Sequence, residues 1–331
     1  MPIRVAVVGG GSWGTTVAAL ASRNVPTTLW CRRPELAAAI TADRCNRDYL
    51  GDFVLPDDLV ATASLEEAVA SADVLVMGVP SHGMRATLRE LAPYLRAWVP
   101  VVSLAKGLEQ GTHLRMTELI TDELPGHPTG VLTGPNLARE ILSGHAAASV
   151  VAFSDNHVAH ELQRVFAGEL FRVYTNGDVV GCEIAGALKN VIAIASGMAD
   201  GLGTGDNTRA AVITRGLAEL SRLGTAMGGQ PATFFGLAGM GDLVATCISR
   251  QSRNRYVGEQ LGLGRSIDEV IAEMKMVAEG VKTSKVVVEL AERYEVEMPI
   301  AAEVFGVIYQ GRTAVDAYRG LLRRASGPEL G

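Results

Sequence analysis

Three glycines near the N-terminus constrain this chain more than any other feature of its sequence. Gly9, Gly11 and Gly14 form the pattern G-x-G-x-x-G directly between an expected strand, Arg4–Val8, and an expected helix, Thr15–Ser22. In that setting the first glycine permits a tight turn, the second lets a pyrophosphate approach the backbone, and the third allows close contact between helix and strand. The N-terminus of the helix offers unpaired N–H groups to the anion. The pattern therefore predicts a dinucleotide site, and an ordinary tight turn is the alternative.

The first half of the chain alternates short apolar runs with helical patterns. The apolar runs lack polar alternation, which indicates strands buried on both faces, as in a parallel sheet covered by helices. Ser64 and Glu67 have the spacing of a capping box at the start of one such helix, Ser64–Ser71. Repeated strand–helix–strand units predict an α/β domain with a Rossmann-like, doubly wound parallel sheet. The expected strands are Arg4–Val8, Thr27–Trp30, Val74–Val79, Val101–Leu104, Val131–Thr133, Ser149–Phe153 and Phe171–Thr175.

The pattern changes near residues 176–181, after which helical periodicity is broken by glycine-rich turns. The length of 331 residues agrees with two domains. We therefore expect a dinucleotide-binding domain over residues 1–178, an all-α substrate and catalytic domain over residues 179–325, and a flexible tail over residues 326–331. The expected helices of the second domain are Gly181–Met198, Thr208–Leu223, Asn254–Leu261, Ser266–Met276, Ser284–Tyr294 and Ala301–Tyr309.

Composition argues against several kinds of function. Thirty Lys and Arg against 36 Asp and Glu give a net charge of −6, the wrong sign for a protein that binds nucleic acid through its phosphates. No stretch approaches the roughly 18 uncharged apolar residues of a membrane span. We expect a cytoplasmic, soluble protein with no nucleic-acid partner. The six histidines show no metal-binding spacing, and the four cysteines are far apart in the sequence, so we expect no metal site. Nothing in the sequence suggests an oxidising compartment, so we expect reduced thiols at Cys31, Cys45, Cys182 and Cys247.

The end of the second strand bears on which dinucleotide binds. Rossmann sites for NAD place an acidic residue there, about 20 residues after the glycines. Thr27–Trp30 is instead followed by Cys31, Arg32 and Arg33, without Asp or Glu. Guanidinium groups at this place can hold a 2′-phosphate through charge-assisted hydrogen bonds. The sequence therefore favours NADP over NAD as the cofactor, and a solvated pair of arginines is the alternative.

Two lysines occupy positions that suit chemistry. Lys189 and Asn190 interrupt a nearly uniform apolar helix, Ile184–Met198. A buried lysine is costly, and burial lowers its pKa toward neutrality, which suits a proton donor for a ketone. Lys106 follows the strand Val101–Leu104, at the sheet edge where ligands bind. The plainer interpretations are a Lys189 that reaches solvent and a Lys106 that is an ordinary surface residue.

Further polar residues punctuate the second domain. Asp242 follows an expected glycine-rich loop, Gly236–Gly241, that we take to be too flexible for packing. Ten residues later Ser252 is a natural N-cap, so that Arg253 and the first N–H groups of the next helix form an anion site. An ordinary capped helix with exposed arginines is the alternative. His82, at a strand end in the first domain, is expected to have a structural role.

In chain order, these and neighbouring blocks resemble the bacterial-type NAD(P)-dependent glycerol-3-phosphate dehydrogenases over nearly the whole chain. Asn136 departs from the family pattern, since many bacterial members have serine there. The blocks are G-G-G-S-W-G (Gly9–Gly14), V-P-S-H (Val79–His82), S-L-A-K-G-L-E (Ser103–Glu109), G-P-N-L-A-R-E (Gly134–Glu140), E-I-A-G-A-L-K-N-V (Glu183–Val191), G-L-A-G-M-G-D-L (Gly236–Leu243), S-R-N-R (Ser252–Arg255), V-A-E-G (Val277–Gly280) and M-P-I (Met298–Ile300).

The resemblance implies a homodimer that reversibly reduces dihydroxyacetone phosphate to sn-glycerol 3-phosphate for glycerophospholipid synthesis. It implies a helical domain like that of 6-phosphogluconate dehydrogenase, with the substrate between the domains. It makes Lys189 the general acid/base and Lys106 and Asp242 its catalytic neighbours. The expected substrate contacts are Lys106, Gly134, Asn136, Lys189, Asn190, Asp242, Ser252, Arg253 and Asn254. The expected contacts with NADP or NAD are Gly9, Gly11, Ser12, Trp13, Gly14, Arg32, Arg33, Lys106, Ala138, Arg253, Val277 and Glu279.

Two other functions fit parts of the sequence. A 3-hydroxyacid or ketopantoate reductase has a similar two-domain build, but its substrates carry no phosphate for the helix that starts at Ser252. A regulatory protein that binds NAD(P) without chemistry would share the glycine pattern. Such a protein would have no use for Lys106, Lys189 and Asp242.

Overall fold

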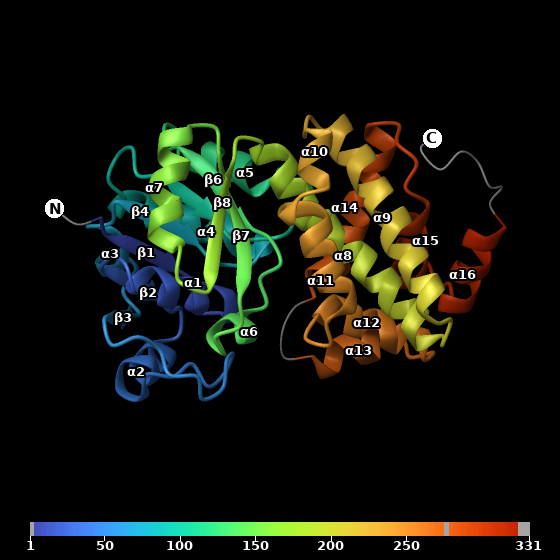
Figure 1. Cartoon of the computed structure of the whole chain (residues 1–331), viewed down its shortest axis with the longest axis horizontal. Coiled ribbons are helices and arrows are strands. Elements are labelled where there is room, and N and C mark those ends of the chain that lie inside the picture. The colour runs from blue at the N-terminus through green and yellow to red at the C-terminus, as the bar shows by residue number, and fades with distance from the viewer. Residues whose placement is uncertain (1–2, 275–277, 324–331) are drawn as a thin grey trace.

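The chain folds into a sheet-based part and a helical part that lie side by side. The computed structural model describes residues 3–274 and 278–323. In Figure 1 the sheet and its helices, blue to green, occupy one side, and the helices from α8 (Val179–Gly201) onward, yellow-green to red, occupy the other. This arrangement confirms the expected Rossmann-like domain followed by an all-helical domain. A domain boundary between residues 178 and 179 stays a prediction.

One sheet contains eight strands: β1 (Val5–Val8), β2 (Thr27–Trp30), β3 (Leu59–Thr62), β4 (Val74–Met77), β5 (Val101–Ser103), β6 (Thr129–Thr133), β7 (Ala147–Phe153) and β8 (Phe171–Asn176). Their order is β3-β2-β1-β4-β5-β6-β7-β8, and β1 to β6 run parallel. In β1, Val5 pairs with Thr27 of β2 and with Val74 of β4. The order reverses between β1 and β4, the place where sheets of this kind bind ligands at their carboxyl edge.

The last two strands differ from the wholly parallel sheet that we expected. β7 runs antiparallel to β6, and β8 runs parallel to β7. β8 also alternates, with Phe171 and Val173 buried and Arg172 and Tyr174 exposed. This edge strand has one face toward solvent, so continuous burial was the wrong expectation for it.

The other edge strand, β3, was missing from the expected set. It has four residues, of which Leu59 is buried and Val60 is 54% exposed. So short and exposed a strand lacks the apolar run that marks the others. Each of the seven expected strands occurs, with ends that lie within two residues of expectation.

Helices cover both faces of the sheet. They are α1 (Ser12–Ser22), α2 (Pro34–Asp43), α3 (Leu65–Val69), α4 (Ser81–Leu91), α5 (Met116–Glu123), α6 (Ala138–Leu142) and α7 (Asn156–Phe166). Alternate residues of β1 belong to different cores: Val5 and Val7 lie in the cluster that contains α1, α2 and α7, and Ala6 and Val8 lie in the cluster that contains α3, α4 and α5. The sheet is therefore doubly wound, as expected.

The capping box expected at Ser64 is half formed. The Ser64 hydroxyl accepts a hydrogen bond from the Glu67 backbone N–H at 3.2 Å. The Glu67 carboxylate does not return to Ser64 but accepts from the Thr62 hydroxyl at 2.6 Å. Helix α3 ends at Val69, two residues before the expected Ser71.

The helical part surrounds α8, whose residues from Gly181 to Ala199 are all buried. Every helix expected here occurs, although the one expected over Ser266–Met276 ends at Glu273, and its residues 275–276 and the tail 326–331 lie outside the described residues. The other elements of the helical part are α9 (Asp206–Ala226), α10 (Pro231–Phe234), a π-helical turn η2 (Leu237–Gly241), α11 (Asp242–Ile248), α12 (Arg253–Gly262), α13 (Ile267–Glu273), α14 (Glu279–Arg293), α15 (Pro299–Tyr309) and α16 (Ala314–Leu322).

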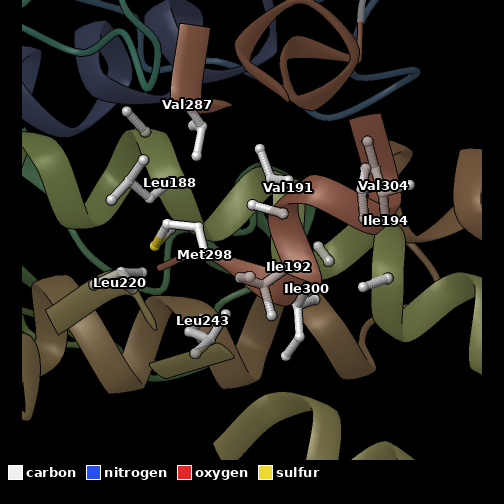
Figure 2. Packing of buried hydrophobic residues seen from close by; sticks show 14 of the residues in the cluster. Leu188, Val191, Ile192, Ile194, Leu220, Leu243, Val287, Met298, Ile300 and Val304 are labelled. Atoms are coloured by element: carbon white, nitrogen blue, oxygen red, sulfur yellow. The ribbon is translucent and has the colours of Figure 1, made fainter. Parts of the chain in front are cut away.

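Figure 2 shows how apolar side chains from several helices converge on α8. Leu188, Val191, Ile192 and Ile194 project from α8 in different directions, so the helix is apolar all round because every face packs. By length and hydropathy alone α8 could cross a membrane, as could the segment Pro231–Ile248. However, 89% of the apolar stretch of α8 is buried inside the protein, which identifies α8 as a core helix. A core helix accounts for this apolar composition without a membrane.

The segment Gly236–Gly241, expected to be a loop too flexible for packing, is instead ordered. Residues Leu237–Gly241 form η2, which runs directly into α11. A Cβ at Gly239 would lie 2.1 Å from the carbonyl oxygen of Phe234. Glycine is therefore needed here for close packing, and the expectation of a flexible loop was wrong.

Helices α8 and α12 meet through glycines on both sides. A Cβ added at Gly197 would lie 2.0 Å from the Arg255 carbonyl oxygen, and one at Gly258 would lie 1.9 Å from the Ile194 carbonyl oxygen. The two backbones thus approach more closely than any side chain allows. This contact fixes α12, and with it Ser252, against the helix that carries Lys189.

Replacing Gly197 by alanine is expected to lower the free energy of unfolding by about 2–3 kcal/mol, because an added methyl group overpacks the contact. Gly83→Ala in α4 is the matched control, since a Cβ there meets nothing within 4 Å. It should leave stability unchanged or raise it by about 0.5 kcal/mol. Thermal unfolding of both variants checks this, and equal Tm values would contradict the packing argument.

Candidate active site

The structure brings together the three residues expected to carry the chemistry. Lys189 comes from the middle of α8, Asp242 is the first residue of α11, and Lys106 lies in the loop after β5. The Asp242 carboxylate accepts a hydrogen bond from Lys189 Nζ through Oδ1 and from Lys106 Nζ through Oδ2 at 2.6 Å. One carboxylate thus holds two ammonium groups.

Two more acceptors fix the lysines. Thr246, one turn after Asp242 on α11, accepts from Lys189 Nζ at 2.6 Å through its hydroxyl oxygen. The carbonyl oxygen of Gly134 accepts from Lys106 Nζ at 2.8 Å. Thr246 was not among the residues predicted from the sequence, although its i+4 spacing from Asp242 places both on one face of a helix.

Burial governs the electrostatics of this cluster. Lys189 is 4% exposed and Asp242 is 1% exposed. Burial lowers the pKa of Lys189 to about 7, with a further lowering by the charge of Lys106, although the carboxylate of Asp242 opposes the shift. Because the burial of the ammonium outweighs its ion pair, Lys189 can both give and take a proton near neutral pH. The interpretation of Lys189 as a lysine that reaches solvent was wrong.

A chain of amide hydrogen bonds ties α8, α12 and α14 to the loop after β5. Asn190 donates to the Lys106 carbonyl oxygen at 3.0 Å. Asn254 donates to the Asn190 side-chain oxygen at 2.9 Å and accepts from the Gly280 N–H at 3.0 Å. These contacts place the start of α12 beside the lysines, although Asn190 and Asn254 stand 64 residues apart.

The start of α12 has the expected cap. The Ser252 hydroxyl accepts from the Arg255 N–H at 3.2 Å. Arg253 is exposed and lies within electrostatic range of Glu279, the first residue of α14. Glu279 in turn accepts from the Ser81 hydroxyl at 2.9 Å, at the carboxyl edge of the sheet. Arg253 therefore faces the sheet-based part of the molecule.

The loop after β6, in which Gly134 and Asn136 were expected to contact the substrate, also makes hydrogen bonds within the protein. Gly134 has a φ of +133°, which favours glycine. Asn136 donates to the Ser149 hydroxyl at 3.0 Å, and its own oxygen is buried without a hydrogen-bond partner in the part of the chain that the structure describes. A buried acceptor without a partner is costly, and a hydrogen bond from a donor group of a ligand would remove that cost. This oxygen is therefore a candidate contact with a ligand.

The glycine-rich turn has the shape that a pyrophosphate requires. Gly9 has a φ of +127°, and a Cβ at Gly14 would lie 2.0 Å from the Gly9 carbonyl oxygen, so neither tolerates a side chain. A Cβ at Gly11 would meet nothing within 4 Å, and no side chain caps the N-terminus of α1. The open N–H groups there suit a diphosphate. The indole N–H of Trp13, the second residue of α1, is buried without a partner among the described residues.

The remaining expected cofactor residues have mixed placements. Arg33 precedes α2 and its guanidinium pairs with Asp48 at 2.5 Å, whereas Arg32 is exposed. Ala138 begins α6, and Val277 lies outside the described residues.

Among the residues that the structure describes, no group of three or more His, Cys, Asp or Glu could hold a metal ion. His82 is exposed at the start of α4.

Comparison with known proteins gives a consistent result along the whole chain. Residues 4–159 match the family model described as NAD-dependent glycerol-3-phosphate dehydrogenase N-terminus, and residues 178–319 match the model of its C-terminus. A glycerol-3-phosphate dehydrogenase [NAD(P)+] of Sphingopyxis alaskensis is 59% identical over 99% of each chain. One of Mycobacterium avium is 57% identical over 99% of this chain and 96% of its own. The crystal structure of glycerol-3-phosphate dehydrogenase from Coxiella burnetii covers 98% of this chain and 99% of its own, with a TM-score of 0.93 and 34% identity.

Proposed function

Because this chain belongs to the NAD-dependent glycerol-3-phosphate dehydrogenase family, we propose that the cluster of Lys189, Asp242 and Lys106 is its active site. The protein is an oxidoreductase that reversibly reduces dihydroxyacetone phosphate to sn-glycerol 3-phosphate with NADH or NADPH. The observation that carries the assignment is the buried carboxylate of Asp242 between two ammonium groups. Family membership rules out the ketopantoate reductase alternative.

Lys189 acts as the general acid in reduction. Its ammonium group donates a proton to the substrate oxygen, and a pKa near 7 leaves the resulting amine ready to accept a proton in the reverse direction. Asp242 and Thr246 orient that ammonium group. Lys106 brings a second positive charge that stabilises the developing alkoxide. The chemistry supplied by a bound nicotinamide is hydride transfer.

The substrate phosphate binds at the start of α12. Ser252, Arg253 and Asn254 provide the N–H groups of the helix N-terminus and one guanidinium group, a combination that suits a phosphate dianion. The amide chain from Asn254 to Asn190 supports this assignment, since it joins the start of α12 to the helix of Lys189. Gly134 and Asn136 line the substrate from the sheet side.

The cofactor diphosphate binds the glycine-rich turn, through Gly9, Gly11, Ser12, Trp13 and Gly14. The open N-terminus of α1 and the unpartnered indole N–H of Trp13 support this. Further contacts are assigned to Lys106, Ala138, Arg253 and Glu279 at the carboxyl edge of the sheet, to Val277, and to Arg32 and Arg33, which would hold the 2′-phosphate of NADP, the favoured cofactor.

The family resemblance also supports a location, an oligomeric state and a metabolic role for the enzyme. We propose that the protein works as a cytoplasmic homodimer and supplies sn-glycerol 3-phosphate for glycerophospholipid synthesis. We also propose that the sheet-based domain comprises residues 1–178 and the helical domain residues 179–325. Expression of either range alone, followed by thermal unfolding, tests the boundary, and the mass of the purified full chain in solution tests the dimer.

Recognition of the phosphate gives the direct test of the proposed substrate site. Wild-type protein should oxidise NADPH rapidly with dihydroxyacetone phosphate and negligibly with ketopantoate. Arg253→Ala should raise KM for dihydroxyacetone phosphate about 100-fold, because a charge-assisted contact with a dianion is lost. The control is Arg265→Ala, which removes an arginine beyond the far end of α12 that pairs with Glu273. Unchanged KM in Arg253→Ala would contradict the proposed phosphate site.

A further inference from the structure

The carboxylate of Asp48 lies beside the end of β2 in the structure, although it is distant from that strand in the sequence. No acidic residue follows β2 directly, where Rossmann sites for NAD carry one. The structure nevertheless brings Asp48 to this place from the segment after α2. Asp48 Oδ2 lies 2.5 Å from Arg33 Nη2, and the Arg33 guanidinium carbon lies 5.9 Å from the centre of the Tyr49 ring.

The segment that carries Asp48 is fixed against the glycine-rich turn. The fully buried Asn46 donates through Nδ2 to the Gly10 carbonyl oxygen at 2.9 Å and to the Thr15 hydroxyl at 2.8 Å. The Tyr49 carbonyl oxygen accepts from the Ser12 hydroxyl at 3.3 Å. Asp48, which lies between these anchors in the chain, is therefore held between the start of α1 and the end of β2. In a Rossmann site this region faces the adenosine ribose of the cofactor.

We propose that Asp48 is a specificity-determining residue that, together with Arg33, lets the site accept either cofactor. When the cofactor carries a 2′-phosphate, Arg33 leaves Asp48 and binds the phosphate. When the cofactor carries a free 2′-hydroxyl, Asp48 accepts a hydrogen bond from that hydroxyl while Arg33 stays paired with it. The assignment rests on the proposed binding of the cofactor diphosphate at the glycine-rich turn.

The exposure of the pair suits such an exchange. The side chain of Arg33 is 42% exposed and that of Asp48 is 54% exposed. An ion pair in this setting contributes little net stability, so a phosphate dianion can displace the carboxylate readily. Asp48 also repels the phosphate, because its carboxylate loses its partner Arg33 and stays close to a second anion. The carboxylate should therefore weaken binding of a 2′-phosphate and strengthen binding of a 2′-hydroxyl.

Binding of two probes that differ only in the 2′-phosphate isolates this effect. Isothermal titration calorimetry of the full chain with 2′-phospho-ADP-ribose and with ADP-ribose requires neither a nicotinamide nor a triose phosphate. Asp48→Asn should tighten Kd for 2′-phospho-ADP-ribose about fivefold and weaken Kd for ADP-ribose about threefold, since an amide is neutral and a poorer acceptor. For Asp48→Asn, the ratio of kcat/KM with NADPH to kcat/KM with NADH should also rise above the wild-type ratio.

Two further variants complete the test. Asp57→Asn makes the same charge change in the same segment but at a residue paired with Arg44, so both Kd values should stay within about twofold of wild type. Arg33→Ala should weaken Kd for 2′-phospho-ADP-ribose about tenfold and leave ADP-ribose nearly unchanged.

Two results would overturn the proposal. Only the second would also contradict the proposed binding of the cofactor at the glycine-rich turn. If wild-type protein binds both probes but Asp48→Asn leaves the ratio of the two Kd values unchanged, Asp48 does not set specificity, and the proposed function stands. If wild-type protein binds neither probe, the assignment of the diphosphate to the glycine-rich turn fails as well.

Discussion

Lys189→Ala is expected to lower kcat for reduction of dihydroxyacetone phosphate by about 1,000-fold, within the range that general acid catalysis supplies. The residue is buried on α8 and its ammonium group is held by Asp242 and Thr246, so the change removes the group that we propose protonates the substrate. The cofactor turn lies on a different element, α1, and is untouched by the change. Steady-state kinetics should therefore show the loss in kcat, while fluorescence titration shows Kd for NADPH within about twofold of wild type.

The control is Lys285→Ala, which removes an exposed lysine from α14 whose nearest carboxylate, Glu289, lies 4.0 Å away. Its kcat should equal that of wild type. If Lys189→Ala also kept full activity, the acid/base assignment would be wrong. Tight NADPH binding together with no activity in the wild-type protein would instead favour a regulatory protein that binds NAD(P) without chemistry.

The parts of the fold that the sequence predicted are those in which local and global signals agree. The glycines at 9, 11 and 14 specify a turn between strand and helix, and the structure has that turn, with α1 starting three residues earlier than expected. The long apolar run of α8 predicted a buried helix because no face of it could meet water. Both predictions depend on a few neighbouring residues.

What the sequence could not predict depends on partners far along the chain. The direction of β7 relative to β6 follows from how the chain returns to the sheet edge, which no residue within Ala147–Phe153 determines. The ordering of Gly236–Gly241 follows from packing on Phe234. In each case an expectation based on local composition was wrong because a tertiary contact decided the conformation.

The candidate site shows the same division. Lys106, Lys189 and Asp242 were each conspicuous in sequence, but only the structure joins them, across 136 and 53 residues. Thr246 and Asp48 were not noticed, since a threonine in a helix and an acid in a polar segment are common. Their roles arise from what they touch, and the resemblance to a family supplied no signal for Asp48.

Asp242→Asn is expected to have a second large effect, because it leaves two ammonium groups in the site without their shared carboxylate. Breaking a buried ion pair in this way costs about 3–5 kcal/mol of folding stability. Orientation of Lys189 is lost as well, so we expect kcat for reduction to fall at least about 100-fold. Asp206→Asn is the control, since it also neutralises an acid at the first position of a helix, α9, but one paired at the surface with Arg209.

The pH profile separates this role from a merely structural one. Reduction needs Lys189 protonated, so the wild-type rate should be high at low pH and should fall as pH rises through about 7, where burial puts the pKa of Lys189. Oxidation of sn-glycerol 3-phosphate needs the neutral amine, so its rate should rise over the same range. The charge of Asp242 raises the pKa of Lys189, so its removal should move both transitions to lower pH. An Asp242→Asn variant that loses stability but keeps the wild-type midpoint would show that the carboxylate does not tune the lysine.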